Sequence, residues 1–221
     1  MKHASKEWTY DYLLTPDSEQ DEMYERVGRQ TISDFLNGYN GTLFTYGQSG
    51  SGKTFSMLGP EEVINALVKD FTSVPKELAK LYGIIPRAVI QIFQTINEYV
   101  SQGNECILSC SFIEIYNEQI NCLLNRKENL KSREHPKFGL DIPDKETIVC
   151  KTPEEIFQVI SIATKNRIVA GTNLNERSSR SHTILMIELE YNGLDGIKRL
   201  SKLNLVDLAG SERVSIFIFN L

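Results

Sequence analysis

Eight residues, Gly47 to Thr54, constrain this chain more than any other stretch. They read Gly-Gln-Ser-Gly-Ser-Gly-Lys-Thr, follow an apolar run over 42–46 that predicts a buried strand, and precede residues that can open a helix. The spacing G-x-x-x-x-G-K-[ST] is that of a phosphate-binding loop, in which glycines let backbone N–H groups point at an anion and a helix N-terminus adds positive charge. The alternative interpretation is a Gly/Ser-rich turn that contains a chance lysine.

The phosphate-loop motif predicts the roles of individual side chains. In such a loop Lys53 reaches the β- and γ-phosphates of a nucleotide, and the Thr54 hydroxyl binds Mg²⁺. The residues expected to contact the nucleotide are Gly47, Gln48, Ser49, Gly50, Ser51, Gly52, Lys53, Thr54 and Phe55.

Two further stretches carry polar groups suited to phosphate chemistry. The apolar run 203–206 ends in Asp207, and a carboxylate at the C-terminal end of a strand can hold the water shell of Mg²⁺ opposite Thr54. The alternative is that Asp207 only begins the next turn. Gly210 offers a small position whose N–H can approach a γ-phosphate. Residues 175–182, Asn-Glu-Arg-Ser-Ser-Arg-Ser-His, can ligate metal and position water, although Ser/Arg-rich loops are also common without any such role.

Composition bounds the class of protein. The 221 residues are 41% hydrophobic and 24% charged, enough for one sizeable α/β core. A net charge of −5 argues against a protein that coats nucleic acid. No run of eighteen apolar residues predicts a membrane span, and residues 1–7 lack the apolar core of a signal peptide.

The cysteines and histidines indicate no metal site. Cys106, Cys110, Cys122 and Cys150 form no C-x-x-C pair, and the three histidines are not spaced with them as metal ligands are. Reduced thiols, buried in the case of Cys106 and Cys110, and a reducing intracellular compartment are expected.

The apolar periodicity predicts alternating helices and strands. We expect a short strand over 8–12, a turn with a helix cap at Pro16 to Ser18, and a helix from about 21 to 37 that Gly38 ends. Residues 58–82 predict a loop with short helical pieces. A helix with Pro86 in its first turn should end at Gly103, and 106–116 should form a strand buried on both faces.

The second half continues the alternation. Residues 125–151 predict a solvated loop, with a basic contact patch as the alternative. Thr152 to Glu155 form a capping box that opens a helix ending at Gly171. Residues 182–191 and 197–207 predict two antiparallel strands, because Asn192-Gly193 and Asp195-Gly196 between them are hairpin signals. The whole predicts one α/β layer structure with a mixed sheet.

Taken together, the motifs resemble those of one family. Residues 47–54, 175–182 and 207–213 (Asp-Leu-Ala-Gly-Ser-Glu-Arg) look like the phosphate loop, switch I and switch II of the kinesin motor domain, in that family's order and at similar separations. Residues 112–118 and 41–47 resemble characteristic kinesin segments, and the resemblance runs from about 8 to 213. It implies a phosphate-loop NTPase fold of three layers, with a mixed central sheet flanked by helices, in a single partial motor domain over 1–221.

The resemblance also implies roles for individual residues. Ser179 would contact Mg²⁺ or the γ-phosphate, and Ser178 would help position the attacking water. Arg180 and Glu212 would form the ion pair that closes the two switches. The implied catalytic residues are Lys53, Ser178, Ser179, Arg180, Asp207, Gly210 and Glu212, and the implied metal ligands are Thr54, Ser179 and Asp207.

Three features depart from the family pattern. No Arg-x-Arg-Pro strand precedes Trp8, and Phe55 stands where the family often has His. After Arg213 the chain continues as an apolar tail over 214–221, where kinesins have a loop and the long helix of the microtubule interface. We therefore expect an incomplete motor domain.

The leading hypothesis is an ATP-binding, ATP-hydrolysing microtubule motor domain, with ATP and Mg²⁺ as cofactors. For the complete protein the resemblance implies the microtubule as partner and a place in the cytoplasm and cytoskeleton, without nucleic acid or membrane. The alternative is a non-motor or regulatory polypeptide that binds ATP without productive turnover. A GTPase is disfavoured because no Asn-Lys-x-Asp motif is present.

Overall fold

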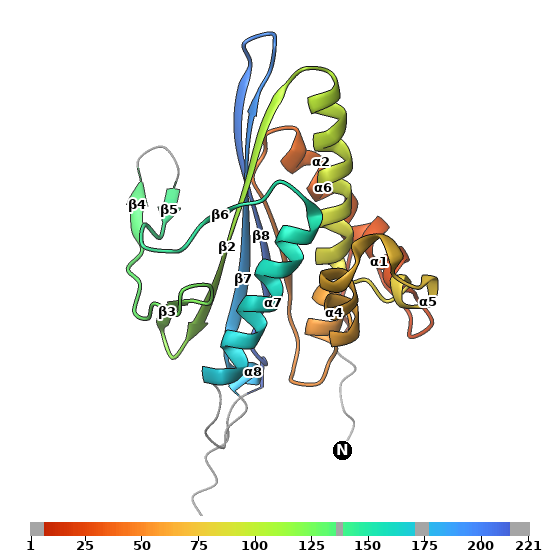
Figure 1. The fold of residues 1–221 in the computed structure, drawn as a ribbon. Helices are drawn as coiled ribbons and strands as arrows, with labels where there is room; N and C mark the ends of the chain where they lie inside the picture. The colour runs from red at the N-terminus through yellow and green to blue at the C-terminus, as the bar shows by residue number, and fades with distance from the viewer. Residues whose placement is uncertain (1–6, 136–138, 171–176, 213–221) are drawn as a thin grey trace, which may run out of the picture.

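A computed structural model of the chain describes residues 7–135, 139–170 and 177–212, and Figure 1 shows its course. The helical elements are α1 Gln20–Met23, a π-helical turn Tyr24–Gly28, α2 Arg29–Leu36, α3 Lys53–Leu58, α4 Glu61–Lys69, a 3₁₀ turn Phe71–Ser73, α5 Lys76–Ala79, α6 Ile84–Ser101, α7 Pro153–Ala170 and α8 Arg177–Arg180. The strands are β1 Gly41–Thr45, β2 Glu105–Tyr116, β3 Gln119–Cys122, β4 Arg133–His135, β5 Gly139–Asp141, β6 Ile148–Val149, β7 His182–Asn192 and β8 Lys198–Asp207.

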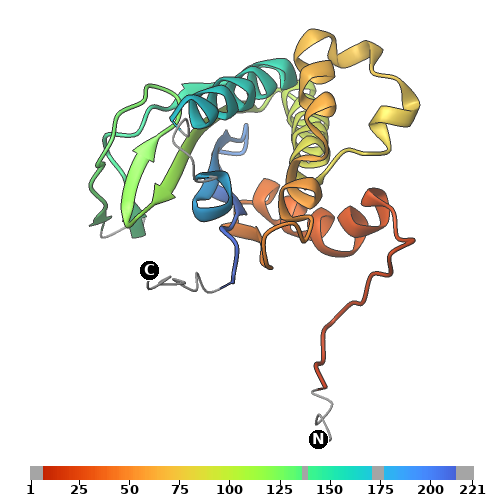
Figure 2. The ribbon, with the colours of Figure 1, turned by 90° about the horizontal axis from the view of Figure 1, so that it is seen from below.

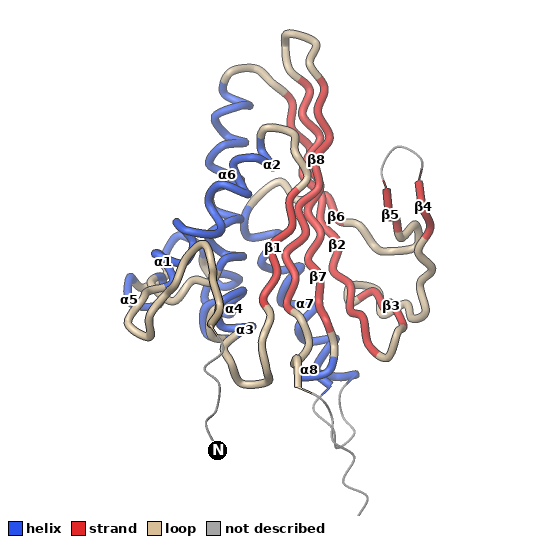
Figure 3. The backbone as a smooth tube through the Cα atoms, turned by 180° about the vertical axis from the view of Figure 1, so that it is seen from behind, coloured by secondary structure: helices blue, strands red, loops and turns tan. Residues whose placement is uncertain are grey.

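A six-stranded mixed sheet organises the molecule. Its order is β1-β8-β7-β2-β3, with β6 paired to β2 beside this path. Strand β1 runs parallel to β8, and the other described pairs of this sheet are antiparallel. The parallel pair brings Thr45 opposite Asp207, so that both strands end at the same edge of the sheet (Figure 3). The mixed sheet flanked by helices confirms the predicted fold class.

The main core lies between one face of this sheet and the helices α2, α4, α6 and α7 (Figure 2). Alternate strand residues face it, because successive side chains of a strand point to opposite faces. Leu185, Ile187 and Leu189 of β7 are therefore buried, as are Ile92 of α6 and Ile160 of α7. A second, smaller cluster on the opposite face contains Ile113, Cys122, Leu130 and Ile142. Among the described residues, the structure contains no helix long and apolar enough to span a membrane.

Several predicted elements are confirmed. The helix expected over about 21–37 spans Gln20–Leu36, with the π-helical turn inside it, and Gly38 ends it with a φ of 98°. The N–H of Gly38 bonds the carbonyl of Phe35, and the N–H of Tyr39 bonds that of Asp34, which is a Schellman ending. The predicted hairpin of 182–191 and 197–207 is present as β7 and β8, antiparallel throughout.

Two of the N-terminal predictions, the strand and the helix cap, were wrong. Residues 8–12 do not form a strand, because the segment leads away from the body of the molecule (Figure 2), with Trp8 65% and Tyr10 71% exposed. The Pro16-Asp17 turn is present, but the helix begins after Glu19 without a side-chain cap. The Ser18 hydroxyl instead accepts a hydrogen bond from the N–H of Thr15.

Other predictions were right in part. Strand β1 is not buried, since it lies at the end of the strand order and Phe44 is 64% exposed. Strand β2 is buried on both faces only in its second half. Residues 58–82 contain the nine-residue helix α4, and 125–151 contain β4, β5 and β6 rather than loop alone.

The capping box differs in detail. Helix α7 begins at Pro153 as predicted, but the Glu155 carboxylate accepts from the N–H of Lys151, at 2.5 Å, rather than from that of Thr152. The expected stop at Gly171 lies outside the described residues.

Candidate functional site

The loop between β1 and α3 has the backbone of an anion cradle. Gly50 and Gly52 adopt left-handed conformations, with φ of 76° and 90°, which residues other than glycine rarely adopt. Helix α3 begins immediately afterwards, at Lys53. A Cβ atom built on Gly50 or Gly52 would meet no heavy atom within 4 Å, and both residues line a cleft. The loop therefore has open space beside these two glycines, in a cleft that could admit a phosphate.

Asp207 joins the end of β8 to the loop. The residue is 6% exposed, and its carboxylate accepts hydrogen bonds from the Thr45 hydroxyl at 3.2 Å and the Thr54 hydroxyl at 2.6 Å. The parallel pairing of β1 with β8 creates this arrangement, because it brings the two strand ends together. Carboxylate and hydroxyl oxygens are ligands that suit Mg²⁺, so the donor set here fits that ion.

Lys53 lies over its own loop. Its Nζ atom donates to the carbonyl of Gln48 at 2.9 Å. The side chain can exchange this neutral acceptor for the oxygens of a phosphate, to which a lysine ammonium binds more strongly because the acceptor is charged.

The segments after α8 and after β8 are tied to each other and to the loop. The N–H of Gly210 donates to the carbonyl of Ser179 at 2.8 Å, and the N–H of Ser211 donates to that of Gly47 at 3.0 Å. The N–H of Ala209 donates to Nδ1 of His182 at 3.1 Å, which requires the imidazole to be unprotonated on that nitrogen. Backbone bonds thus bring the three predicted motifs together.

Glu212 contacts the phosphate loop rather than Arg180. Its carboxylate accepts from the N–H of Ser49 at 2.9 Å and from the Ser49 hydroxyl. The Ser49 hydroxyl bond is the main cause that lowers the pKa of Glu212 to about 2. In the described part of the chain no ion pair joins Arg180, which is exposed, to Glu212. The expected pairing of the two stays a prediction for a nucleotide-bound state.

Many of the predicted site residues line one cleft of ≈370 Å³. Its lining residues are Ser49, Gly50, Gly52, Lys53, Thr54, Phe55, Ser179, Asp207, Leu208 and Gly210. Gly47, Gln48, Ser51, Arg180 and Glu212 lie outside this lining, although Gly47, Gln48 and Glu212 bond to residues of the site. The backbone of Ser178 lies in α8, and its side chain falls outside what the structure describes.

Three residues near the cleft were missed by the sequence reasoning. Thr45 donates to Asp207, and no local pattern indicates this contact because the pairing of β1 with β8 creates it. Gln20, 7% exposed, donates to the carbonyl of Phe55 at 2.7 Å and so connects α1 to α3. Nothing in the sequence indicates this contact, because 35 residues separate its partners. His182 was noted only as part of a motif.

A partly buried cation, Arg167, supports the segment that carries Ser179. The Nη2 atom of Arg167 on α7 donates to the hydroxyl of Ser181 at 3.0 Å and to its carbonyl at 3.3 Å. The same guanidinium lies 3.7 Å from the carboxylate of Glu114, which is fully buried in β2. A charge pair therefore links α7 and the sheet to the start of β7.

Comparison with known proteins gives consistent matches. The family model for the kinesin motor domain matches residues 1–216. The chain is 45% identical over 214 residues to Kinesin-related protein 5 of Dictyostelium discoideum, an alignment that covers 96% of this chain and 20% of that protein. It is 41% identical over 216 residues to Kinesin-like protein KIF15 of Homo sapiens, covering 94% and 15% respectively.

A solved structure described as that of a fast kinesin superposes with a TM-score of 0.83 at 34% sequence identity, over 97% of this chain and 57% of that one. The chain thus spans a fifth or less of the length of these curated relatives and 57% of the matched structure. The family model covers nearly all of the chain, and the sheet, the loop and the switch segments agree with it. The chain therefore belongs to the kinesin motor domain family.

Proposed function

We propose that this chain is the nucleotide-binding part of a microtubule motor, and that its cleft binds and hydrolyses ATP. The observation that carries the proposal is the Thr45–Asp207–Thr54 arrangement beneath an open glycine loop. It supplies oxygen ligands beside an anion cradle, which is the combination that phosphoryl transfer requires.

Each residue of the cleft has a separate role in the proposed hydrolysis of ATP. The loop amides and Lys53 bind the β- and γ-phosphates, and Gly210 directs its N–H toward the γ-phosphate. Ser178 would help position the attacking water, and Ser179 would contact Mg²⁺ or the γ-phosphate. Asp207, which bonds the Thr54 hydroxyl, would hold the water shell of the metal. Mg²⁺, when bound, neutralises charge that develops on the phosphate oxygens. Catalysis is then mainly positioning and charge stabilisation.

The switch contacts suit a sensor of the γ-phosphate. Glu212 bonds Ser49, and Gly210 bonds the carbonyl of Ser179, in the structure described above. A γ-phosphate that takes the loop N–H groups would displace Glu212 and leave it to pair with Arg180. Order in these two segments then reports the nucleotide to a track-binding surface. Microtubules are the proposed track, with the cytoplasm and the cytoskeleton as the location.

A binding experiment tests the nucleotide part. A fluorescent ATP analogue is titrated into the chain and into Lys53→Ala, with the exposed Lys69→Ala as matched control and with ATP and GTP as competitors. We expect Lys53→Ala to weaken binding by about 100-fold, because it removes a charge-assisted contact to phosphate, and Lys69→Ala to leave it unchanged. Equal affinities in the two variants would refute a phosphate role for Lys53, and preference for GTP would refute ATP as the ligand.

A turnover experiment tests the motor part. Phosphate release is measured with and without microtubules, for this chain and for a polypeptide that extends it to the full length of a motor domain. Stimulation by microtubules in the longer polypeptide supports the proposal. Tight binding of ATP with no release in either would favour a nucleotide-binding regulatory polypeptide instead.

A further inference from the structure

Two cysteines that are 40 residues apart in the chain meet inside the core. Cys110 lies in β2, and Cys150 lies between β6 and α7. Strands β2 and β6 pair antiparallel, with Cys110 opposite Ile148. Cys150 is two residues beyond Ile148, so it faces the same side of the sheet as Cys110 and lies diagonally across from it.

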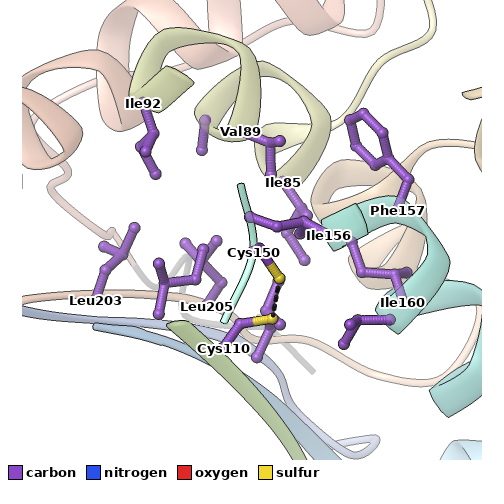
Figure 4. Close-up of a cluster of buried hydrophobic side chains, with 14 of the residues drawn as sticks. Ile85, Val89, Ile92, Cys110, Cys150, Ile156, Phe157, Ile160, Leu203 and Leu205 are labelled. Atoms are coloured by element: carbon purple, nitrogen blue, oxygen red, sulfur yellow. Dashed lines mark hydrogen bonds between the residues drawn. The ribbon is translucent and has the colours of Figure 1, made fainter. Parts of the chain in front are cut away.

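The two thiols are in direct contact. Their Sγ atoms are 3.4 Å apart, joined by the dashed line in Figure 4, and the side chains are 1% and 3% exposed. Their surroundings are apolar and come from α6, α7 and the sheet, as Figure 4 shows with Ile85, Ile156 and Leu205. A disulfide requires an S–S distance of about 2.0 Å, so a relative movement of about 1.4 Å would join them.

The thiols differ in acidity. The hydrogen bond between them and burial raise the pKa of Cys110, whereas the same hydrogen bond lowers the pKa of Cys150. Cys150 is therefore the more acidic of the two thiols. Because the thiolate is the nucleophile, Cys150 is suited to attack an oxidant and Cys110 to resolve the product.

Access to the pair depends on a short element. Strand β6 has two residues and holds the segment before α7 against β2 through the pairs Ser109–Val149 and Cys110–Ile148. A further backbone hydrogen bond, from the N–H of Cys150 to the carbonyl of Leu108 at 2.9 Å, extends the pairing of this segment with β2. So few bonds can open locally without global unfolding, which would expose Cys150 to a small oxidant.

We propose that Cys110 and Cys150 form an oxidisable dithiol site that a hydroperoxide converts to an intrachain disulfide. The Cys150 thiolate attacks the peroxide oxygen, the O–O bond breaks, and a sulfenic acid forms with release of hydroxide or an alkoxide. The Cys110 thiolate then attacks the sulfenic sulfur, forms the S–S bond and releases a second hydroxide. The two thiol protons end on these oxygens, and two thiols have been oxidised while one peroxide has been reduced.

The disulfide would fasten the start of α7 to the sheet. It closes a loop of about 40 residues, which reduces the entropy of the unfolded chain, and we expect the Tm to rise by about 5–10 °C. None of the cleft-lining residues takes part, so nucleotide affinity should stay within about 2-fold. Cys106 cannot replace Cys150, because it lies on the same strand as Cys110, about 13 Å away.

The test uses hydrogen peroxide on the chain and on Cys106→Ser, which removes the half-buried thiol. The samples are unfolded, alkylated and mapped as unreduced peptides by mass spectrometry. We expect one joined pair containing Cys110 and Cys150, lighter by two hydrogens, that a reductant separates. Cys122→Ala, at a buried thiol of the second core cluster, is the matched control and should form the same pair.

The Cys110→Ala and Cys150→Ala variants should lose both the joined peptide and the peroxide-dependent rise in Tm. Peptide mapping of the unsubstituted chain decides the matter even where a variant folds poorly. Alkylation of both Cys110 and Cys150 after peroxide, or joining of either one to Cys106 or Cys122, would overturn the proposal.

Discussion

The cleft and the layer between α6, α7 and the sheet are held together by different forces. Around the cleft, a handful of hydrogen bonds sets the geometry, as between Thr54 and Asp207 or Gly210 and Ser179. In the layer below, large apolar side chains such as Phe157 and Ile160 are fully buried. A hydrogen bond contributes about 1 kcal/mol net, whereas full burial of a side chain of this size contributes about 1.5–3 kcal/mol.

This difference separates stability from chemistry. The apolar layer should tolerate no loss of side-chain volume, yet none of its buried side chains lines the nucleotide cleft. The cleft should tolerate loss of a group without unfolding, because its loops are exposed and few contacts hold them. Substitutions in the two regions should therefore affect different measurements.

The largest effect on stability is expected at Phe157. The side chain is fully buried, and its ring centroid is 5.8 Å from that of Phe71. Phe157→Ala should reduce the free energy of unfolding by about 3–5 kcal/mol in urea denaturation, through lost burial and the remaining cavity. Ile162→Ala, on the same helix but 45% exposed, should cost less than about 1 kcal/mol. Equal losses in the two variants would contradict the importance of this layer.

The largest effect on chemistry is expected at Asp207. Asp207→Asn keeps the shape but removes the negative charge that Thr45 and Thr54 contact, so ATP turnover should fall by about 100-fold or more. Thermal unfolding should change little. Asp144→Asn, at an exposed ion pair with Lys127, serves as the control and should leave turnover unchanged. A drop in Tm that parallels the lost turnover would show that Asp207 acts through folding instead.

A smaller effect is expected at Gly210. A Cβ atom there would collide with the Glu212 carboxylate and the Ser49 hydroxyl. Gly210→Ala should therefore push Glu212 off the loop and slow phosphate release by about 10-fold, as misplacement of a positioning group does. Nucleotide affinity should remain near that of the unsubstituted chain, and unchanged release would argue against a sensing role for this N–H.

The smallest effect is a pH response. The pKa of Glu212 is lowered from 4.5 to about 2, so its contact with Ser49 favours the ionised form, is fully present above pH 4.5 and is lost as the pH falls toward 2. The amide resonance of Ser49 should thus stay constant between pH 7 and pH 4, followed by NMR on the chain and on Glu212→Gln. A titration with a midpoint near 4.5 would contradict the contact.

Much of the cleft was predictable because its signals are local. The glycines of the loop, the lysine and the threonine follow each other within eight residues, and the strand-end position of Asp207 follows from an apolar run. The sequence alone also indicated the β7–β8 hairpin through its turn residues. The same reasoning failed for residues 8–12, because alternation predicts a strand only where another strand is there to pair with it.

Other features depend on contacts between distant residues. The π-helical turn at 24–28 follows no periodicity, and a Cβ at Gly28 would come within 2.6 Å of the Tyr24 ring. The exposed position of Phe44 depends on β1 lying at the end of the strand order, which no local pattern encodes. The partner of Glu212 depends on how the switch segment folds back over the loop.

The sequence by itself determined the family, the phosphate loop and the alternation of helices and strands, because spacing, periodicity and turn chemistry are properties of neighbouring residues. Only the tertiary structure decided that Thr45 and Thr54 share the Asp207 carboxylate, that Glu212 bonds Ser49, and that Cys110 meets Cys150. Three of these four contacts join residues more than 150 positions apart, and the cysteines are 40 apart. Such pairings follow from strand order and register, which the packing of the whole core selects.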